Sequence, residues 1–376
     1  MRKNKKGIAH CRKLCYNTIG KRFPNILELR WMVTIKEIAQ KAGVSPATVS
    51  RVLTNSRNVN PEIKKNVLRI ADESGYSPNV AARSLVKKGT KAIGVVVTNL
   101  HDPFFHDLIL GFEAGAVESD YNVVFCSTMG KNEQEKQSYL KYLSNGVVDG
   151  IILYGTYRFD EVFVRELHTS GFPLVLIENQ VEGVKTNVFL IDNRQGQYNA
   201  VRYLHKFGHR RIAYIAGKQN KQVCTERLEG YHAAIRDLML PDDAMYTRFL
   251  SHSSDDAGDI MEDFLQMPDD IRPTAVLCYD DAAAAQAIMR AMSQGFRVPE
   301  DVSVMGFDNQ TIPPSGYVGP RITSVSQPLY EIGFDSIIQL ARYISDQKKE
   351  QIIRTYSTTI AEKDSVTLCK KGVLSI

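Results

Sequence analysis

The 376-residue sequence lacks the features that mark membrane proteins, disulfide-rich secreted proteins and metal-binding proteins. No apolar run approaches the roughly 20 residues that a bilayer-spanning helix needs. The six cysteines are scattered, with no CxxC pair and no histidine at metal-ligand spacing, so we expect reduced thiols and no bound metal. The first residues lack the apolar stretch and cleavage site of an export signal, and we therefore expect a cytoplasmic protein.

Motifs of common enzyme active sites are also missing. The chain has no GxSxG nucleophile turn, no GxxxxGK[ST] phosphate loop, no HExxH zinc motif and no EF-hand loop. We expect a protein that is not an enzyme and that carries no cofactor.

Charge is present but unevenly distributed. Residues 1–31 hold nine Lys/Arg and one Glu, and residues 32–91 hold eleven Lys/Arg and four Asp/Glu; residues 92–376 carry 27 basic and 37 acidic side chains. A basic front end on an acidic body suggests that the front end meets a polyanion such as DNA, although a solvated basic surface has the same composition.

A short helix with both ends marked is predicted in "VTIKEIAQKAG". Thr34 and Glu37 have the spacing of a capping box, in which each side chain binds the other residue's backbone N–H. Ile35, Ile38 and the following alanines form one apolar face, and Gly43 supplies the left-handed stop.

A second helix follows after a short turn, in "SPATVSRVL". Ser45 is a preferred N-cap, and Pro46 takes the first helical position, where its missing N–H costs nothing. The same polar-residue-plus-proline start recurs at Asn60-Pro61 and Ser77-Pro78.

The tight turn between the first two helices is typical of a helix-turn-helix unit. Val49, Val52 and Leu53 are expected to face the core. The opposite face is small except for Arg51, so that the backbone can approach DNA and a guanidinium can reach a guanine edge. An ordinary three-helix bundle with a solvated Arg51 would have the same pattern.

The stretch "TIKEIAQKAGVSPATVSRVLTNSRNVNPEIKKNVLRIADESGYSPNVAARSL" closely resembles the DNA-binding headpiece of the lactose-repressor/galactose-repressor family. The resemblance implies a dimer on double-stranded, near-palindromic operator DNA. It assigns base-reading roles to Pro46, Ala47 and Arg51 and phosphate contacts to Thr34, Thr48 and Ser50. "SPNVAARSL" is similar to the family's minor-groove hinge helix, in which Asn79 and Arg83 contact DNA and Leu85 is wedged between bases, bending the duplex.

From Lys91 onward, apolar strand runs alternate with helical runs, which predicts parallel sheets covered by helices in two doubly wound lobes. Ligands of such sheets bind beyond the carboxyl ends of the strands. Polar residues follow several of these strands, although Asp281 can also be a cap of the helix after it.

The body resembles the family's periplasmic-binding-protein-like core, which binds a small effector between its lobes. The resemblance implies these effector contacts: Phe104, Phe105, Glu178, Arg227, Asp280, Asp308 and Gln327. Carboxylates, a planar guanidinium and aromatic faces suit a sugar or a related small polar molecule. The residues do not decide between a neutral and a phosphorylated ligand, or between induction and corepression. A binding protein for transport and a carbohydrate-processing enzyme are the rival classes.

The predicted α/β organisation is a small all-α helix-turn-helix headpiece followed by a two-lobed core. The boundaries are 1–31 for a basic extension, 32–76 for the headpiece, 77–91 for the hinge helix and linker, 92–367 for the core and 368–376 for a tail. Within the core we expect a first lobe of about 92–191 plus 325–351 and a second of about 192–324 plus 352–367. We expect the extension to be disordered or to lie before the native start; a basic arm that adds phosphate contacts is the alternative.

Overall fold

The computed structural model describes residues 33–53, 59–76, 89–155, 160–218, 222–251, 256–311, 313, 316–345 and 350–369. The predicted extension 1–31, residues 77–88 of the hinge region and residues 370–376 of the tail lie outside these ranges. The chain divides into two compact units, Met1–Lys88 and Gly89–Ile376, which we take in turn. No helix in the described ranges is both long enough and apolar enough to cross a bilayer.

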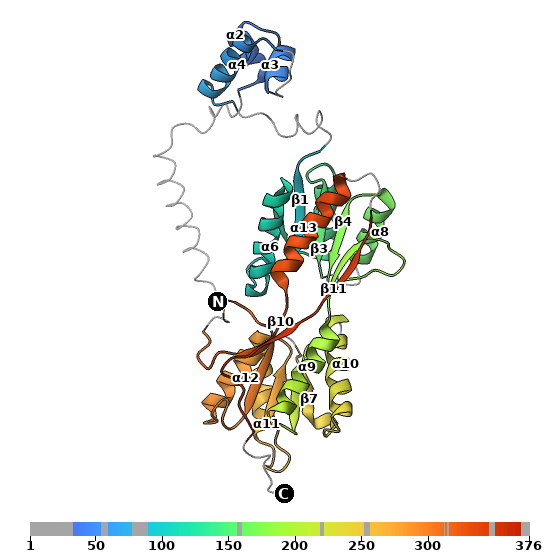
Figure 1. The fold of residues 1–376 in the computed structure, drawn as a ribbon, viewed down its shortest axis with the longest axis vertical. Helices are drawn as coiled ribbons and strands as arrows, with labels where there is room; N and C mark the ends of the chain where they lie inside the picture. The colour runs from blue at the N-terminus through green and yellow to red at the C-terminus, as the bar shows by residue number, and fades with distance from the viewer. Residues whose placement is uncertain are drawn as a thin grey trace, which may run out of the picture. The chain divides into compact units, whose positions relative to one another are not determined.

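The described residues of the first unit form the helices α2 (Ile35–Ala42), α3 (Pro46–Leu53) and α4 (Pro61–Glu73) (Figure 1). The predicted capping box is present: Glu37 N–H donates to Thr34 Oγ1 at 3.3 Å, and Thr34 N–H donates to the Glu37 carboxylate at 2.9 Å. Gly43 ends α2 with a φ of 66°. The predicted starts at Pro46 and Pro61 are confirmed, and the one at Pro78 lies outside the described residues.

A small apolar core holds these helices together. It consists of Ile38, Ala39, Val49, Val52, Val67, Ile70 and Ala71. Val49 and Val52 belong to it as predicted, so the opposite face of α3 is left for solvent or a partner.

The second unit contains two sheets, one in each lobe. The first has the order β11-β5-β4-β3-β1-β2, and its pairings are parallel. Its strands are β1 (Ala92–Val97), β2 (Asn122–Ser127), β3 (Gly150–Tyr154), β4 (Leu174–Ile177), β5 (Asn187–Ile191) and β11 (Ile353–Tyr356).

The second sheet has the order β12-β10-β9-β8-β6-β7. Its strands are β6 (Ile212–Ala216), β7 (Thr247–Phe249), β8 (Ala275–Cys278), β9 (Ser303–Asp308), β10 (Thr323–Ser326) and β12 (Thr359–Ala361). The edge strand β12 pairs antiparallel with β10, whereas the other pairings are parallel.

Helices cover both faces of each sheet, as expected for doubly wound lobes. Because neighbouring residues of a strand point to opposite faces, Val95 and Ile152 belong to one apolar cluster of the first lobe and Val96 and Ile151 to another. The helices of the first lobe are α6 (His106–Ser119), α7 (Glu133–Ser144), α8 (Asp160–Ser170) and α13 (Leu329–Ser345), and those of the second are α9 (Asn193–Lys206), α10 (Gln222–Asp237), α11 (Asp256–Leu265) and α12 (Asp281–Ser293). Short 3-10 turns cover Pro103–Phe105 (η2) and Ala244–Tyr246 (η3).

Two of the predicted lobe boundaries are wrong by a few residues. β10 remains in the second sheet to Ser326, beyond the predicted boundary at 324/325. β11 pairs with β5 of the first sheet, with Ile353 opposite Val188, although 352–367 was assigned to the second lobe. The sheet to which a short edge strand belongs depends on the strand with which it pairs, and the local sequence does not reveal that partner.

Candidate functional site

The α3 helix presents the predicted DNA-reading residues on its outer face. Pro46, Ala47 and Arg51 are exposed, whereas Thr48 and Ser50 are partly buried. Ser45 fixes the start of the helix, because its Oγ accepts the Thr48 N–H at 3.1 Å.

Thr34, the remaining predicted headpiece contact, is exposed at the start of α2. Its contact with a phosphate stays a prediction, which the preference of helix N-termini for anions favours. The predicted hinge contacts Asn79, Arg83 and Leu85 lie outside the described residues.

In the core, an aromatic cluster follows the first lobe's central strands. The rings of Phe104 and Phe105 are 5.1 Å apart, and Tyr154, the last residue of β3, lies 5.8 Å and 5.1 Å from them. Burial raises the pKa of Tyr154 well above its usual range, and the nearby charges of Glu178 and Asp308 add to the effect. Tyr154 therefore packs against the predicted effector residues Phe104 and Phe105, a placement that sequence reasoning missed.

Glu178 follows β4 with a φ of 54°, a left-handed conformation that is uncommon outside glycine. Its Oε1 accepts the Ile191 N–H at 2.6 Å and its Oε2 accepts Nδ2–H of Asn193 at 2.8 Å. Burial raises the pKa of Glu178 to about 7, although the hydrogen bonds from Asn193 and Ile191 and the charge of Arg227 oppose the shift.

Arg227 of α10 is buried, and each of its three side-chain nitrogens donates a hydrogen bond. Nε donates to Asn193 Oδ1 at 3.0 Å, one terminal nitrogen donates to the Tyr279 carbonyl at 2.6 Å and the other to Asp308 Oδ1 at 3.4 Å. Its guanidinium lies 3.5 Å from the centre of the Phe307 ring. Burial disfavours the charged form, but Asp308 and nearby tyrosines outweigh it and raise the pKa of Arg227 above its ordinary value.

Asp308 ends β9 and is 8% exposed. Gln327, which follows β10, donates from Nε2 to the same Oδ1 that Arg227 contacts. Burial raises the pKa of Asp308 well above its usual range, although Arg227 opposes the shift. Four of the predicted effector residues, Glu178, Arg227, Asp308 and Gln327, thus meet in one hydrogen-bonded network completed by Asn193.

The two adjacent aspartates that follow β8 have different structural roles. Asp280 caps α12 by accepting the Ala283 N–H at 2.7 Å, whereas Asp281, for which a capping role was the alternative, is the first residue of the helix. Asp281 is buried and accepts hydrogen bonds from Ser324 Oγ at 2.6 Å and Gln310 N–H at 2.7 Å. Burial raises the pKa of Asp281 to about 7.

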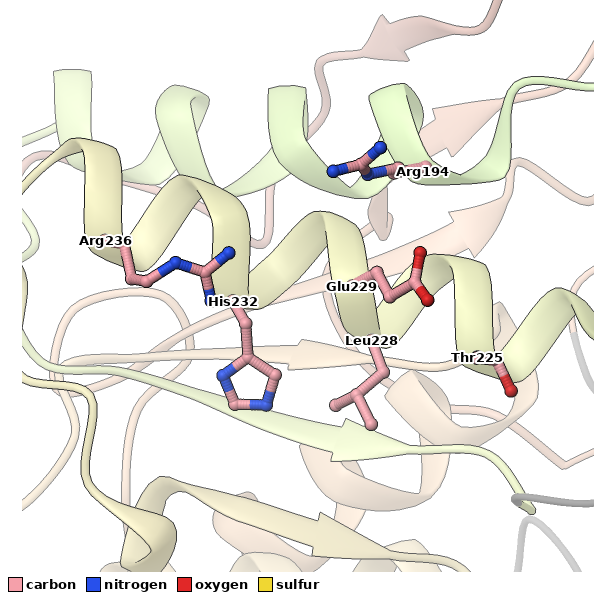
Figure 2. A pocket seen from close by; sticks show the side chains of 6 residues that line it. All are labelled: Arg194, Thr225, Leu228, Glu229, His232 and Arg236. Atoms are coloured by element: carbon pink, nitrogen blue, oxygen red, sulfur yellow. The ribbon is translucent and has the colours of Figure 1, made fainter.

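A separate cavity of about 410 Å³ lies on the surface of α9 and α10 (Figure 2). Its lining consists of Arg194, Thr225, Leu228, Glu229, His232 and Arg236. None of these is a predicted effector contact, so this cavity is distinct from the network around Arg227. Within the described ranges, no group of three or more His, Cys, Asp and Glu side chains is arranged to hold a metal ion.

Two family models match the chain in the regions described above. The model of bacterial regulatory proteins, lacI family, matches residues 34–79, and that of the periplasmic binding protein-like domain matches residues 201–366.

Relatives extend the similarity over nearly the whole chain. The HTH-type transcriptional repressor PurR of Aliivibrio salmonicida (strain LFI1238) is 30% identical over 335 residues, or 89% of this chain and 99% of that protein. The HTH-type transcriptional repressor CytR of Escherichia coli (strain K12) is 33% identical over 314 residues, or 84% and 90%. Among solved structures, a complex of the transcriptional regulator CelR with cellobiose is similar with a TM-score of 0.65 and 29% identity, covering 89% and 99% of the two chains.

Proposed function

The chain belongs to the lacI family of bacterial regulatory proteins, and from that membership we propose that it represses transcription in the cytoplasm by binding operator DNA under the control of a small effector. The observation that carries the DNA-binding half is α3 itself: a capped helix within the matched segment 34–79 with Pro46, Ala47 and Arg51 on its exposed face.

On DNA, α3 enters the major groove with its amino-terminal residues against the base edges. Arg51 donates two parallel hydrogen bonds to a guanine, while Pro46 and Ala47 offer shape and apolar contact. Thr34, Thr48 and Ser50 hold phosphates. Asn79, Arg83 and Leu85 in the predicted hinge contact the minor groove, where Leu85 separates two base pairs and bends the duplex.

The effector binds where Glu178, Arg227, Asp308 and Gln327 meet. Carboxylates that accept hydroxyl donors, beside the rings of Phe104 and Phe105, suit a sugar or a related polar molecule. The cellobiose in the CelR complex is consistent with this class. Asp280, whose side chain caps α12, stays a proposed contact.

The proposed assembly is a homodimer, so that two headpieces read the two halves of a near-palindromic operator. Leu110 and Val117 support it, because they lie seven residues apart on α6 and are exposed by 43% and 84%. Val117→Arg is expected to lower the dimer fraction in analytical ultracentrifugation, and an unchanged sedimentation profile would place the dimer contact elsewhere.

Effector binding regulates the operator complex only if it stabilises one arrangement of the lobes over another. Binding-site selection with the full chain tests the DNA-binding half, and a palindromic motif is expected. A thermal-shift screen of sugars and sugar phosphates tests the other half, since a ligand of the native state raises the midpoint. Asp308→Ala should abolish the thermal shift without weakening operator binding. If the protein were instead a transport protein, it would select no DNA motif. If it were an enzyme, it would turn the ligand over.

A further inference from the structure

The Asn193 side chain joins the effector groups of the two lobes. Asn193 begins α9, directly after the chain leaves β5 of the first lobe, and it is 1% exposed. Nδ2 donates to Glu178 Oε2 at 2.8 Å and to the Ile191 carbonyl at 3.2 Å, while Oδ1 accepts from Arg227 Nε at 3.0 Å. One amide thus connects a carboxylate of the first lobe with a guanidinium of the second.

The chemistry of the neighbours fixes the orientation of this amide. Arg227 can only donate, so Oδ1 has to face it, and Nδ2 then faces Glu178. Glu226 also lies on this side, with Oε2 3.4 Å from Nδ2, so both carboxylates around Asn193 are on its donor end.

We propose that Asn193 is a positioning residue that holds the two lobes in one relative arrangement, and that an effector regulates the protein by competing for this bridge. The regulatory part rests on the proposed function. Effector hydroxyls that bind Glu178 or Arg227 take the hydrogen-bonding capacity that the Asn193 amide uses, so occupancy of the site loosens the connection at the first crossing between the lobes.

The other amide of the network does not have this role. Gln327 donates to Asp308, and both residues belong to the carboxyl ends of the second sheet, so their contact orders one lobe only. A further polar contact between the lobes joins Thr311 Oγ1 to Asp107 Oδ2 at 2.8 Å, but it is exposed and includes none of the effector groups.

Two substitutions separate the two ends of the bridge. Asn193→Asp keeps an acceptor for Arg227 but replaces the donor that faces Glu178 with a like charge. Asn193→Leu removes the hydrogen bonds to Glu178 and Arg227 and keeps the same branched arrangement of heavy atoms. Gln195→Leu is the matched control, because Gln195 lies two residues further along α9, is exposed and donates from its side chain to Asn199 Oδ1 at 2.9 Å, outside the network.

The first measurement is the distance between the lobes in the full-length protein without effector. Nitroxide labels on p-acetylphenylalanine at Val162 and Met239, which are 55% and 92% exposed, report it by double electron–electron resonance and leave the cysteines untouched. The wild type and Gln195→Leu are expected to share one distribution, and both Asn193 variants should broaden or shift it. Folded Asn193 variants with the wild-type distribution overturn the proposal.

The second measurement reads Glu178 directly. In carbon-13 NMR of glutamate side-chain carboxyls, assigned with Glu178→Gln, the titration midpoint of Glu178 should rise in both Asn193 variants, because a hydrogen-bond donor to the charged form is lost. Loosened packing alone would admit water to Glu178 and lower that midpoint, because burial is the main cause of its raised pKa, so an unchanged or lowered midpoint also overturns the proposal.

The third measurement is affinity for the operator obtained by binding-site selection. The Asn193 variants should change it severalfold with an unchanged selected motif, since the recognition helix is intact. Altered lobe distances with wild-type operator affinity would refute the regulatory half. If the wild type selects no DNA motif, the proposed function fails, whereas the distance and NMR results still decide the bridge.

Discussion

Glu178 and Asp308 occupy equivalent positions in the two lobes. Each lies at the carboxyl end of the third strand of its sheet, β4 or β9, with positive φ values of 54° and 103°. Each accepts a hydrogen bond from an amide that follows the neighbouring strand, Asn193 after β5 and Gln327 after β10. Of the two, only Asp308 also contacts the guanidinium of Arg227. The two carboxyls therefore share their position in the sheet and their backbone conformation, but only Asp308 is paired with a positive charge.

Glu178→Gln should remove a specific pH dependence of stability. The pKa of Glu178 is about 7 in the folded protein and ordinarily 4.5. Protonation of Glu178 therefore stabilises the folded protein; this stabilisation is fully present below about pH 4.5 and is lost as the pH rises through 7. Relative to the variant, the wild type should lose at most about 3 kcal/mol of unfolding free energy from low to neutral pH. Urea unfolding at pH 5 and pH 8 measures this difference.

The control for this prediction is Glu118→Gln, at an exposed position of α6. It should follow the wild type at both pH values. Parallel pH profiles for the wild type and Glu178→Gln would show that Glu178 titrates normally.

Arg51→Ala should weaken operator binding by about 1–3 kcal/mol and relax the preference at one base pair of each half-site, because the arginine proposed to read a guanine is removed. Binding-site selection with the variant, followed by titration of the selected DNA, measures both effects. Lys36→Ala, at an exposed position on α2, is the control. Any loss of affinity that it causes should be the same for all DNA sequences, so the selected motif stays unchanged. An unchanged motif for Arg51→Ala would exclude a base-reading role.

Local signals made the headpiece predictable from sequence. Thr34 and Glu37 lie three residues apart, and Pro46 stands beside its cap Ser45, so the contacts that set these helix ends lie within one turn. The strand ends Glu178 and Asp308 were identifiable for a similar reason, because a polar residue directly follows an apolar run.

Tyr154 and Asn193 could not be predicted in the same way. Asn193 matters because of Glu178 and Arg227, which are 15 and 34 residues away, and only the pairing of β4 with β5 and the packing of α9 on α10 bring them together. Asp280 and Asp281 show that sequence reasoning does not distinguish the roles of two adjacent aspartates. A shift of one residue along the chain decides which carboxylate caps α12 and which is buried against Ser324.

His209 should make the core sensitive to acid. It is 2% exposed, with Nδ1 3.0 Å from Thr274 Oγ1 and Nε2 3.1 Å from the Thr367 carbonyl, and burial lowers its pKa to about 4. In the unfolded chain the pKa of His209 is near 6.5. The contribution of neutral His209 to the free energy of unfolding is therefore fully present above that pH and is lost as the pH falls towards 4.

At pH 5 the expected loss from this residue is about 2 kcal/mol. His209→Gln should lower stability at pH 7.5 but flatten the change between pH 7.5 and 5, measured by urea unfolding. His101→Gln, at an exposed position, is the control and should keep the wild-type slope. If His209→Gln keeps that slope as well, acid sensitivity arises elsewhere.

Gly111→Ala should destabilise the first lobe, because the backbones of α6 and α13 touch at this glycine. A Cβ at Gly111 would lie 2.1 Å from the Tyr330 carbonyl oxygen, and one at Gly333, on the facing helix, 2.4 Å from the Leu108 carbonyl oxygen. Backbone atoms cannot rotate away as a flexible side chain can, so the helices have to separate (Figure 1).

We expect Gly111→Ala to cost about 1–3 kcal/mol, the range for overpacked sites, since separating α6 from α13 also disturbs the buried Leu108 and Phe112. Gly258→Ala is the matched control on α11, where the nearest atom to an added Cβ is 3.6 Å away. Removing a glycine from a helix without a clash should stabilise it by up to about 1 kcal/mol. Thermal unfolding should therefore show opposite shifts for the two variants. Equal shifts would mean that α6 and α13 have room to adjust, and that their glycines are not required for the packing of this lobe.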